Sequence, residues 1–484
     1  MSKPKILITN MDVHGVNFYR SEQPAISLSK LYDDEFEIDY VKNIDWNNDE
    51  FLKQYDIIHG HRTLCDFAQM PILVDKLHSF GIKVILDIDD YWEVSKEHPL
   101  YHAVKKDNLK DKIVANLKIV DAVSTTTPVY ENYIKPYNKN ILVIPNGINR
   151  NLKEWIPADD KCSYDKLRIL YLAGSSHLQD VSLLKDSFEK LIHDTSIANK
   201  FQVHLSGFDL RGTTTNYIVN EEFIKEIQAI GIFNEKLYKK LVANNFDIVN
   251  TEEIPQHIIQ KYNGNTIQEQ SRAIKPQETV WTRYEEIFTS NYKLIKDKDY
   301  YDFLMKFDLD AVYEKQSEQN YFRHKTQGLY KFAANYKFGD IALAPIKVYG
   351  KGVNDDNSDN RYQFAKSNLK VIEAAFHKVP VIASDVSIYN HDKDWVDGKN
   401  ILYVNPDRQY KDWYKKIKYC INNPNHVKDM GEAAYELACK RYDIDVLSHI
   451  RADFYKKLIK EKQEQYQLVW FGSWILSSFK FLLI

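Results

Sequence analysis

Short apolar runs that alternate with helical segments are the feature that most constrains the fold of this chain. In the first third, helical segments separate strand-like runs that begin at Lys5, Phe36, Asp56, Lys83, Val120 and Ile141. A second series of runs begins at Leu167, Phe201, Asp340, Val379 and Asn400. Strands that alternate with helices form parallel sheets with helices on both faces. The sequence therefore predicts an α/β protein with two doubly wound Rossmann-like domains.

A polar connector over about residues 151–165 separates the two series. We expect an N-terminal domain over residues 1–155 and a C-terminal domain over residues 160–425. Helices over residues 426–466 should then pack back toward the N-terminal domain. Within the second domain, residues 211–324 are rich in Lys, Tyr, Asn and Glu and are too long for a plain loop. We expect a mostly helical insertion there.

The composition is that of a soluble globular protein, with 44% hydrophobic and 27% charged residues. The formal net charge of −3 argues against a surface that coats nucleic acid, although a local basic groove in the insertion would escape this argument. No CxxC pair occurs among the four cysteines, Cys65, Cys162, Cys420 and Cys439. The sequence thus predicts neither a zinc site nor a disulfide framework, and it fits a reducing cytoplasm. The first apolar run is too short for a signal peptide.

The last part of the chain, residues 467–484, is strongly apolar and aromatic and follows a charged run that begins at Lys456. It is long enough to reach through a hydrocarbon core only if untilted, and Lys480 lies inside it. Three interpretations stay open. The segment is a final element packed on the core, an anchor on a membrane surface with Trp and Phe at the interface, or a true span.

Residues 366–385 are predicted to form a loop, a helix and a buried strand. Ser367 is a good N-cap, because its hydroxyl can accept a free N–H of the first turn. The helix should run from about Asn368 to Lys378, where Pro380 stops it. The apolar run after the proline has the pattern of a covered parallel strand.

One face of this helix carries two cations and a carboxylate near its N-terminal end. Lys366, Lys370 and Glu373 are spaced i, i+4 and i+7, so they share that face. A helix N-terminus attracts anions through its free N–H groups and its dipole. The face could hold a nucleotide sugar, with the lysines on the diphosphate and the carboxylate on the ribose hydroxyls. The alternative is an ordinary solvated charged face.

Polar residues that follow the strands are the other candidates, since ligands of such sheets lie beyond the carboxyl ends of the strands. They are His14, Gly15, His59, His61, Asp89, Asp90 and Asn146. The acidic run that includes Asp87, Asp89 and Asp90 suits an acceptor-side polar site, structural hydrogen bonding or a divalent cation. We expect His59 and His61 at the edge of a loop near the acceptor and not as a metal pair. We predict no metal site.

Four motifs follow one another along the chain: Ile144-Pro-Asn-Gly147, Ala173-Gly-Ser-Ser-His177, Asp340-Ile-Ala-Leu-Ala-Pro345, and Lys366-Ser-Asn-Leu-Lys-Val-Ile-Glu373 with its following strand. Together with Gly15-Val-Asn-Phe-Tyr-Arg20 and Leu86-Asp-Ile-Asp-Asp90, they resemble the retaining glycosyltransferases of the GT-B fold, specifically family four. The resemblance covers most of the chain except the insertion and the tail. It implies two Rossmann-like domains that face a cleft, and transfer of a sugar from a nucleotide-diphosphate sugar to a hydroxyl acceptor with retention of configuration.

The resemblance also implies roles for individual residues and no tightly bound cofactor. The donor would contact Gly15, Gly174, Ser175, His177, Ser367, Asn368 and Glu373. Lys366 and Lys370 would stabilise the leaving diphosphate, and Asp89 and Asp90 would orient the acceptor. No protein nucleophile is nominated.

This sequence departs from the family pattern at three positions. The second of two family glutamates matches Glu373, but the first position holds Ala365. An arginine and a lysine that many members place on the diphosphate are replaced by Ser175 and Asp180. Because an unpaired buried charge is costly, the missing cations should come from elsewhere. The candidates are Lys366 and Lys370 and, from the other domain, Arg20 or Arg62.

Two other classes of function remain, because a fold does not fix a function. A sugar-nucleotide epimerase of the same architecture would convert the donor with no acceptor present. A non-catalytic carbohydrate-binding protein would bind a sugar and leave it unchanged.

Overall fold

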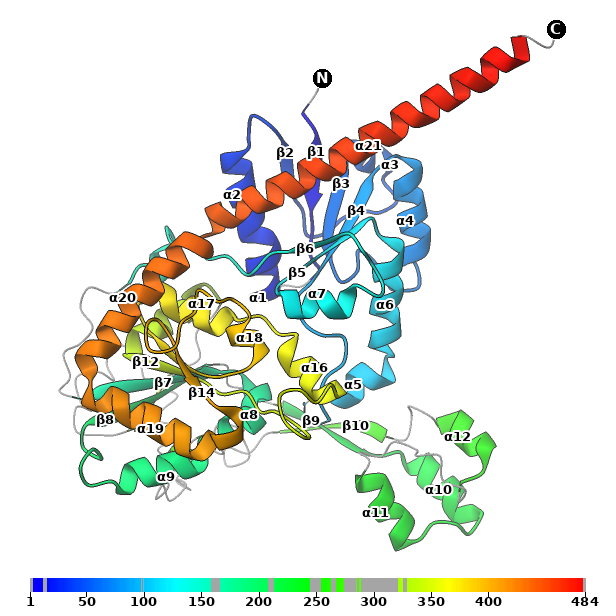
Figure 1. Ribbon diagram of the computed structural model, residues 1–484. Coiled ribbons are helices and arrows are strands. Elements are labelled where there is room, and N and C mark those ends of the chain that lie inside the picture. Colours follow the sequence, from blue (N-terminus) through cyan, green and yellow to red (C-terminus); the bar gives the residue numbers. More distant parts are fainter. Residues whose placement is uncertain are drawn as a thin grey trace.

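The structure is a computed structural model. It describes residues 3–11, 15–96, 98, 100–157, 166–207, 213–243, 254–262, 267–273, 284, 287–288, 321–324 and 329–481. Two six-stranded sheets, each entirely parallel, form the centres of two helix-covered units (Figure 1). The predicted fold class is therefore confirmed.

The N-terminal sheet has the strand order β2-β1-β3-β4-β5-β6. Its strands are β1 (Lys5–Ile8), β2 (Glu37–Tyr40), β3 (Ile57–His61), β4 (Lys83–Ile88), β5 (Ala122–Thr125) and β6 (Ile141–Val143). The helices of this part are α1 (Gly15–Asn17), the π-helix η1 (Phe18–Glu22), α2 (Gln23–Leu31), α3 (Asp49–Leu52), α4 (Met70–Ser79), α5 (Tyr101–Lys106), α6 (Leu109–Ile119) and α7 (Pro128–Ile134). The central strands are buried on both faces, as their continuous apolar runs require.

The C-terminal sheet has the order β11-β8-β7-β12-β13-β14. Its strands are β7 (Leu167–Ala173), β8 (Phe201–Gly207), β11 (Tyr321–Arg323), β12 (Ile341–Ala344), β13 (Val381–Ser384) and β14 (Leu402–Val404). Its helices are η2 (Lys153–Trp155), η3 (Ser175–His177), α8 (Leu178–Ser182), α9 (Lys185–His193), η5 (Leu329–Phe338), α16 (Ser358–Phe364), α17 (Leu369–Phe376), α18 (Ser387–Asn390), η6 (Pro406–Arg408) and α19 (Gln409–Asn422).

Of the predicted lysine face, Lys370 and Glu373 lie on α17, whereas Lys366 lies before the N-cap of this helix. A second helix packs against α17 and fixes its position. The helix α20 (Pro424–Arg441) crosses it at Gly431, where an added Cβ would lie 2.3 Å from the Lys378 carbonyl oxygen. The backbone of Lys378 has a φ of 56°, a left-handed conformation that ends a helix. The N-cap is Asn368, one residue after the predicted Ser367. The prediction of Ser367 as the cap is wrong: the helix begins one residue later than predicted, and the Ser367 hydroxyl accepts a hydrogen bond from Asn146.

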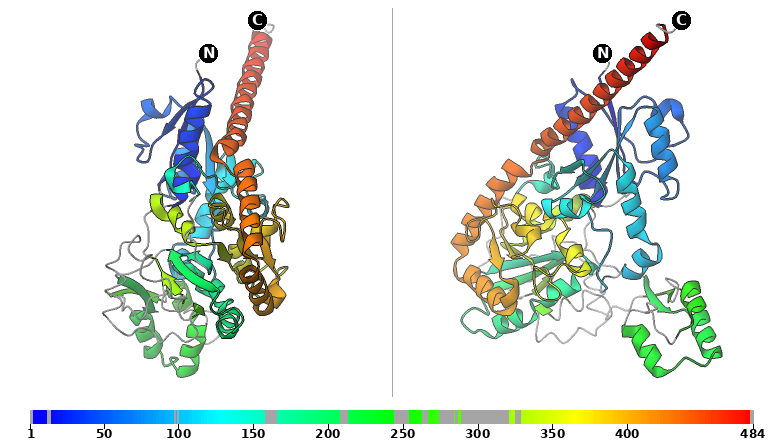
Figure 2. Two further views of the ribbon diagram at one scale, coloured as in Figure 1. Left: turned by 90° about the vertical axis from the view of Figure 1, so that its left-hand side faces the viewer. Right: turned by 45° about the vertical axis from the view of Figure 1, so that its right-hand side comes forward.

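The insertion contains strands as well as helices among its described residues. An antiparallel pair, β9 (Thr213–Val219) and β10 (Ile267–Ala273), lies beside three helices, α10 (Glu221–Ala229), α11 (Glu235–Ala243) and α12 (Gln256–Tyr262). The helices share their own hydrophobic core, made by Phe223, Ile227, Leu237, Leu241, Ile254, Ile258, Ile259 and Tyr262. Both figures show this part projecting from the C-terminal sheet, so its core is separate from the main ones (Figures 1 and 2).

The last helix, α21 (Ile444–Phe481), returns to the N-terminal part and packs on α2. Tyr455 of this helix is buried and lies 2.7 Å from Nδ1 of His59 on β3. Its C-terminal end extends away from both sheets (Figures 1 and 2). In the part of the chain that the structure describes, no helix has the length and apolar character that a membrane crossing requires.

The chain crosses between the two sheets twice, and the crossings are paired. The backbone at Ile148 forms a parallel bridge with Asp443. The N–H of Ile148 donates to the Tyr442 carbonyl at 2.9 Å, and the N–H of Ile444 donates to the Ile148 carbonyl at 2.9 Å. The outgoing and returning segments therefore run side by side where the domains meet.

Candidate functional site

The start of α17 lies where the two domains meet, and we call its surroundings the interdomain site. Asn146, which follows β6, donates to the Ser367 hydroxyl at 3.0 Å. Tyr362 of α16 packs with the hydrophobic cluster of the N-terminal domain and lies 5.3 Å from the ring of His98. The lysine face therefore lies against strand ends of the other sheet, as ligand sites of parallel sheets do.

The two lysines of this face are half-buried and close to opposite charges. Lys366 Nζ donates to Gln363 Oε1 at 2.9 Å and lies 4.3 Å from the centre of the Tyr362 ring. Burial lowers the pKa of Lys366, against the attraction of Asp180 and Asp90. Lys370 Nζ has no hydrogen bond or ion pair within the described ranges. Lys370 is thus a half-buried cation at a helix N-terminus that feels the charges of Asp180 and Glu373 without contacting either carboxylate directly.

Glu373 is the buried member of the face. Its Oε1 accepts from the Tyr19 hydroxyl at 2.6 Å, and its Oε2 accepts from the Tyr336 hydroxyl at 2.8 Å. Burial raises the pKa of Glu373, while the two hydroxyls and Lys370 oppose the rise. Both carboxylate oxygens are therefore occupied by protein groups from two different parts of the chain.

The turn after β7 places Gly174, Ser175 and His177 beside the lysine face. Gly174 begins the turn, and an added Cβ there would meet nothing within 4 Å. His177 Nδ1 lies 2.8 Å from Asp180 Oδ2. Burial lowers the pKa of His177 to about 3, with a further contribution from Lys370. The imidazole is neutral at neutral pH, and its Nδ1–H donates to Asp180.

Asp180 replaces a cation of the family pattern and is a fully used hydrogen-bond acceptor. Besides His177, it accepts from the Lys347 backbone N–H at 2.8 Å and from Gln363 Nε2 at 3.0 Å. Burial alone would raise the pKa of Asp180, but the bond to His177 and the nearby cations leave it lowered. Asp180 is therefore an anion that partly balances the two lysines.

The acidic residues at the end of β4 have two different surroundings. Asp89 and Asp90 contact side chains that follow β3, whereas Asp87 is paired in the core. His61 Nε2 lies 2.9 Å from Asp89 Oδ1, and Arg62 Nη2 lies 3.5 Å from Asp89 and 3.3 Å from Asp90. Although burial opposes it, the neighbouring His61 and Arg62 hold the pKa of Asp89 below its ordinary value. Arg62 has a φ of 53° at the end of β3, so its guanidinium is turned back toward these carboxylates.

Arg20 does not serve the donor, and the prediction that it reaches across is wrong. Its guanidinium is buried and holds Asp87 with contacts of 2.6 and 3.0 Å, and it also donates to the Ile144 carbonyl at 2.8 Å. Asp87 belongs to this pair, so it is not available to a ligand. Arg62, whose side chain is 31% exposed, stays a candidate cation from the N-terminal domain.

His59 and His61 point to different surroundings. His59 lies between Tyr455 at 2.7 Å and Ser124 at 3.0 Å, while His61 contacts Asp89. Among the described residues, no three His, Cys, Asp or Glu side chains gather closely enough to hold a metal. Gly15 begins α1, and the neighbouring candidate His14 lies outside the described residues.

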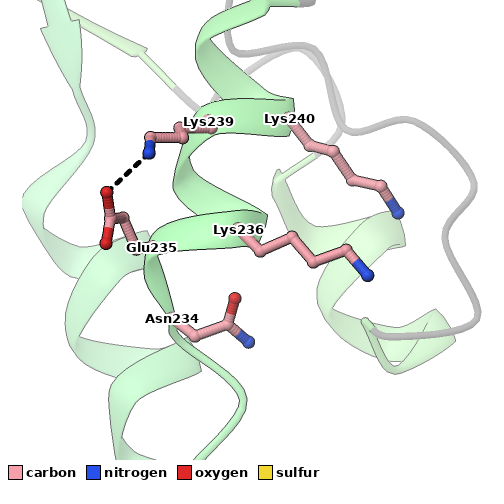
Figure 3. A pocket seen from close by; sticks show the side chains of 5 residues that line it. All are labelled: Asn234, Glu235, Lys236, Lys239 and Lys240. Carbon is pink, nitrogen blue, oxygen red and sulfur yellow. Dashed lines mark ion pairs between the residues drawn. The ribbon is translucent and has the colours of Figure 1, made fainter.

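A pocket lies on the insertion, away from the interdomain site. Asn234, Glu235, Lys236, Lys239 and Lys240 of α11 and its preceding loop line it (Figure 3). Lys239 is paired with Glu235 at 2.6 Å. The same views show α11 on the far side of the hairpin from α17, so this pocket is separate from the lysine face (Figures 1 and 2).

Three contacts of the site were not predictable from the sequence motifs. Tyr19 lies within the motif over residues 15–20, but nothing in that motif indicates its hydrogen bond to Glu373. Tyr336 lies in a segment without a recognisable motif. Gln363 lies one helical turn before Lys366, and that spacing is the only signal that could have found it.

Comparison with solved structures identifies the fold of this chain. No protein-family model matches the chain, and no curated protein matches it. A glycosyltransferase from Rickettsia africae ESF-5 has 14% sequence identity and a TM-score of 0.50, over 95% of this chain and all of that chain. Sucrose-phosphate synthase from Thermosynechococcus elongatus has 13% identity and a TM-score of 0.49, over 95% of this chain and all of that one. Anabaena Alr3699/HepE in complex with UDP and glucose has 10% identity and a TM-score of 0.49, over 94% of this chain and all of that one. The chain thus has the two-domain fold of a solved glycosyltransferase, that from Rickettsia africae.

Proposed function

We propose that the protein transfers a sugar from a nucleotide-diphosphate sugar to a hydroxyl acceptor with retention of configuration. The observation that carries the proposal is Lys370, a half-buried cation at the start of α17 whose ammonium makes no hydrogen bond or ion pair with any described residue. Burying a charge is costly unless something pairs with it, and the N-terminus of a helix favours an anion. A diphosphate would supply that anion. The retaining outcome rests on the resemblance of the motifs to family four.

The proposed roles follow the arrangement of the site. Lys366, Lys370 and the N–H groups near Ser367 and Asn368 bind the diphosphate, on which negative charge grows as the bond to the sugar breaks. The side-chain amide of Asn368 is buried at the start of α17. Gly174, Ser175 and His177 line the donor from its own domain, and Gly15 faces it from the other.

We assign the acceptor to the N-terminal domain, residues 1–155, and the donor to residues 160–425. Asp89 and Asp90 would orient the acceptor hydroxyl, with Arg62 and His61 holding the two carboxylates in place. The donor needs no resident metal or cofactor in this scheme, because the lysines supply the positive charge.

A panel of nucleotide sugars, incubated with and without hydroxyl acceptors and analysed by mass spectrometry, tests the proposal. Sugar transfer, or slow donor hydrolysis without acceptor, is the expected result. An epimerised donor formed without acceptor would replace the proposal with the epimerase. Binding of a sugar with no turnover of any donor would indicate the non-catalytic protein.

Nucleotide affinity should fall as the pH rises above about 8, because burial lowers the pKa of Lys370 to about 8. The charged form binds phosphate, so its contribution is complete below this pKa and is lost as the pH rises through it, at up to about tenfold per pH unit. Calorimetric titration with UDP, or with the nucleotide that the panel identifies, measures the decline. The variant Lys370→Arg stays charged and should bind with a flatter pH profile. A wild-type affinity that stays constant over this range would remove Lys370 from the phosphate site.

We further propose a cytoplasmic enzyme that touches a membrane surface through residues 467–484. The backbone of α21 carries this segment away from both sheets, and the segment is rich in Trp, Phe and Leu. Such residues favour the boundary between headgroups and acyl chains. Removing residues 467–484 should lower the fraction bound to vesicles of phosphatidylcholine and phosphatidylglycerol by at least about tenfold.

Co-sedimentation with the vesicles measures this loss, and nucleotide binding by the shortened chain serves as the folding control. The double variant Trp470→Ser and Trp474→Ser keeps the length of the segment and should show a large part of the same loss. Equal sedimentation of the full and shortened chains would exclude the membrane contact.

A further inference from the structure

A buried carboxylate is held between two tyrosines at the meeting point of the domains. Glu373 is 4% exposed, and its two oxygens accept from Tyr19 and Tyr336, which are 8% and 1% exposed. A hydrogen bond to a charged group is about twice as strong as one between neutral groups. The three side chains therefore form a strong unit from which water is excluded.

The two tyrosines reach the carboxylate from different domains. Tyr336 comes from η5, which packs on β7 and β8 of the same domain as Glu373. Tyr19 comes from η1, and the next residue, Arg20, is fixed in the N-terminal core by Asp87. Tyr19 and Phe18 are nevertheless buried in the hydrophobic cluster of the C-terminal domain. The hydrogen bond from Tyr19 to Glu373 thus joins the two domains, whereas the bond from Tyr336 lies within one domain.

A ligand that uses Glu373 has to take the place of one of these hydroxyls. A ribose hydroxyl and a tyrosine hydroxyl are donors of the same kind. A carboxylate that is 4% exposed is closed to a ligand unless a group that covers it moves. Tyr336 moves with Glu373 when the domains separate, so it can stay bonded and orient the carboxylate. Tyr19 leaves with the other domain and frees one oxygen.

We propose that the Tyr19–Glu373 hydrogen bond is a latch that holds the domains together when the donor is absent, and that a nucleotide has to break it to bind. This inference rests on the proposed function and on the sequence prediction that Glu373 binds the ribose hydroxyls of the donor. The latch keeps the site closed when no nucleotide is bound. When the nucleotide enters, its ribose hydroxyl replaces the Tyr19 hydroxyl as a donor to Glu373. Donor affinity is consequently reduced by the free energy of opening.

The variants Tyr19→Phe and Tyr336→Phe form a matched pair for the test. Each keeps an aromatic ring and removes one hydrogen bond to the same carboxylate, but only the first removes an interdomain bond. Tyr19→Phe should bind UDP about tenfold more tightly than the wild type, since a bond to a buried charge is lost from the closed state alone. Tyr336→Phe loses its bond from both states and should change the affinity by less than about twofold.

Two measurements on the full-length protein separate the latch from the proposed function. Small-angle X-ray scattering without ligand should give a larger radius of gyration for Tyr19→Phe than for the wild type or Tyr336→Phe. Calorimetric titration with UDP and GDP then measures affinity. An expanded Tyr19→Phe in a protein that binds neither nucleotide would uphold the latch and count against the proposed function.

The latch is overturned by either of two results. One is that Tyr19→Phe has the same radius of gyration as the wild type. The other is that it binds the nucleotide no more tightly than Tyr336→Phe, while the wild type binds it. In both cases nucleotide binding by the wild type would leave the proposed function standing.

Discussion

Replacing Asp87 with alanine is expected to lower the free energy of unfolding by about 3–5 kcal/mol, because it leaves a buried guanidinium without its partner. The side chains of Arg20 and Asp87 are 1% and 2% exposed, and their contacts measure 2.6 and 3.0 Å. Asp87 also accepts a hydrogen bond from the Ser124 hydroxyl, and this bond is lost as well. Urea unfolding followed by circular dichroism measures the loss.

An exposed ion pair of the same sheet gives the matched control. Lys5 and Glu37 lie 3.0 Å apart on β1 and β2, but the Glu37 side chain is 60% exposed. Glu37→Ala should cost at most about 1 kcal/mol. The double variant Arg20→Met and Asp87→Leu should recover much of the stability lost in Asp87→Ala, since it removes both charges. A loss below about 1 kcal/mol for Asp87→Ala would show that this pair does not support the fold.

The second large effect is on turnover. Lys370→Ala should reduce sugar transfer by at least about tenfold, or about 1.4 kcal/mol of transition-state stabilisation, because the leaving diphosphate loses a cation. The ammonium has no protein partner in the described residues, so its removal breaks no internal contact. Burial also penalises its charge, as its lowered pKa shows. The melting temperature of Lys370→Ala should therefore stay level or rise while turnover falls.

Steady-state rates and a thermal melt of the same preparation measure both quantities. Lys393→Ala removes a lysine of the same domain whose ammonium only contacts the Asn390 carbonyl at the surface, and it should leave the rate unchanged. Unchanged transfer and donor hydrolysis in Lys370→Ala would take this lysine out of the mechanism. A lower melting temperature would instead mean that its role is structural.

The sheets were predictable because their strands are short, apolar and buried on both faces, which few other elements imitate. The position of α17 was predictable for the same reason, since the apolar strand β13 follows it directly. Its exact start was not, because Ser367 and Asn368 are both good caps by residue type. The Ser367 hydroxyl instead accepts from Asn146, which is distant in sequence, and the side chain of Asn368 makes no capping bond.

The charged residues were harder to place than the apolar ones. Arg20 looked available because it ends a motif, but its partner Asp87 is 67 residues away and buried with it. The latch joins residues that are 354 positions apart, and no local pattern reports such a contact. For Asp180, the sequence indicates only that a cation of the resembled family is absent at this position. The structure adds that Asp180 is a buried acceptor of hydrogen bonds from His177 and Gln363.

The paired crossings at Ile148 and Asp443 limit how the two halves of the molecule can move. A single flexible connection would allow rotation about any axis. Two backbone segments that are hydrogen-bonded side by side resist twisting and sliding, since either motion would break the bonds of Ile148 to Tyr442 and Ile444. Bending across the pair breaks neither bond, so we expect the two halves to separate by bending about this paired segment. Each donor cycle would then return Tyr19 to the same oxygen.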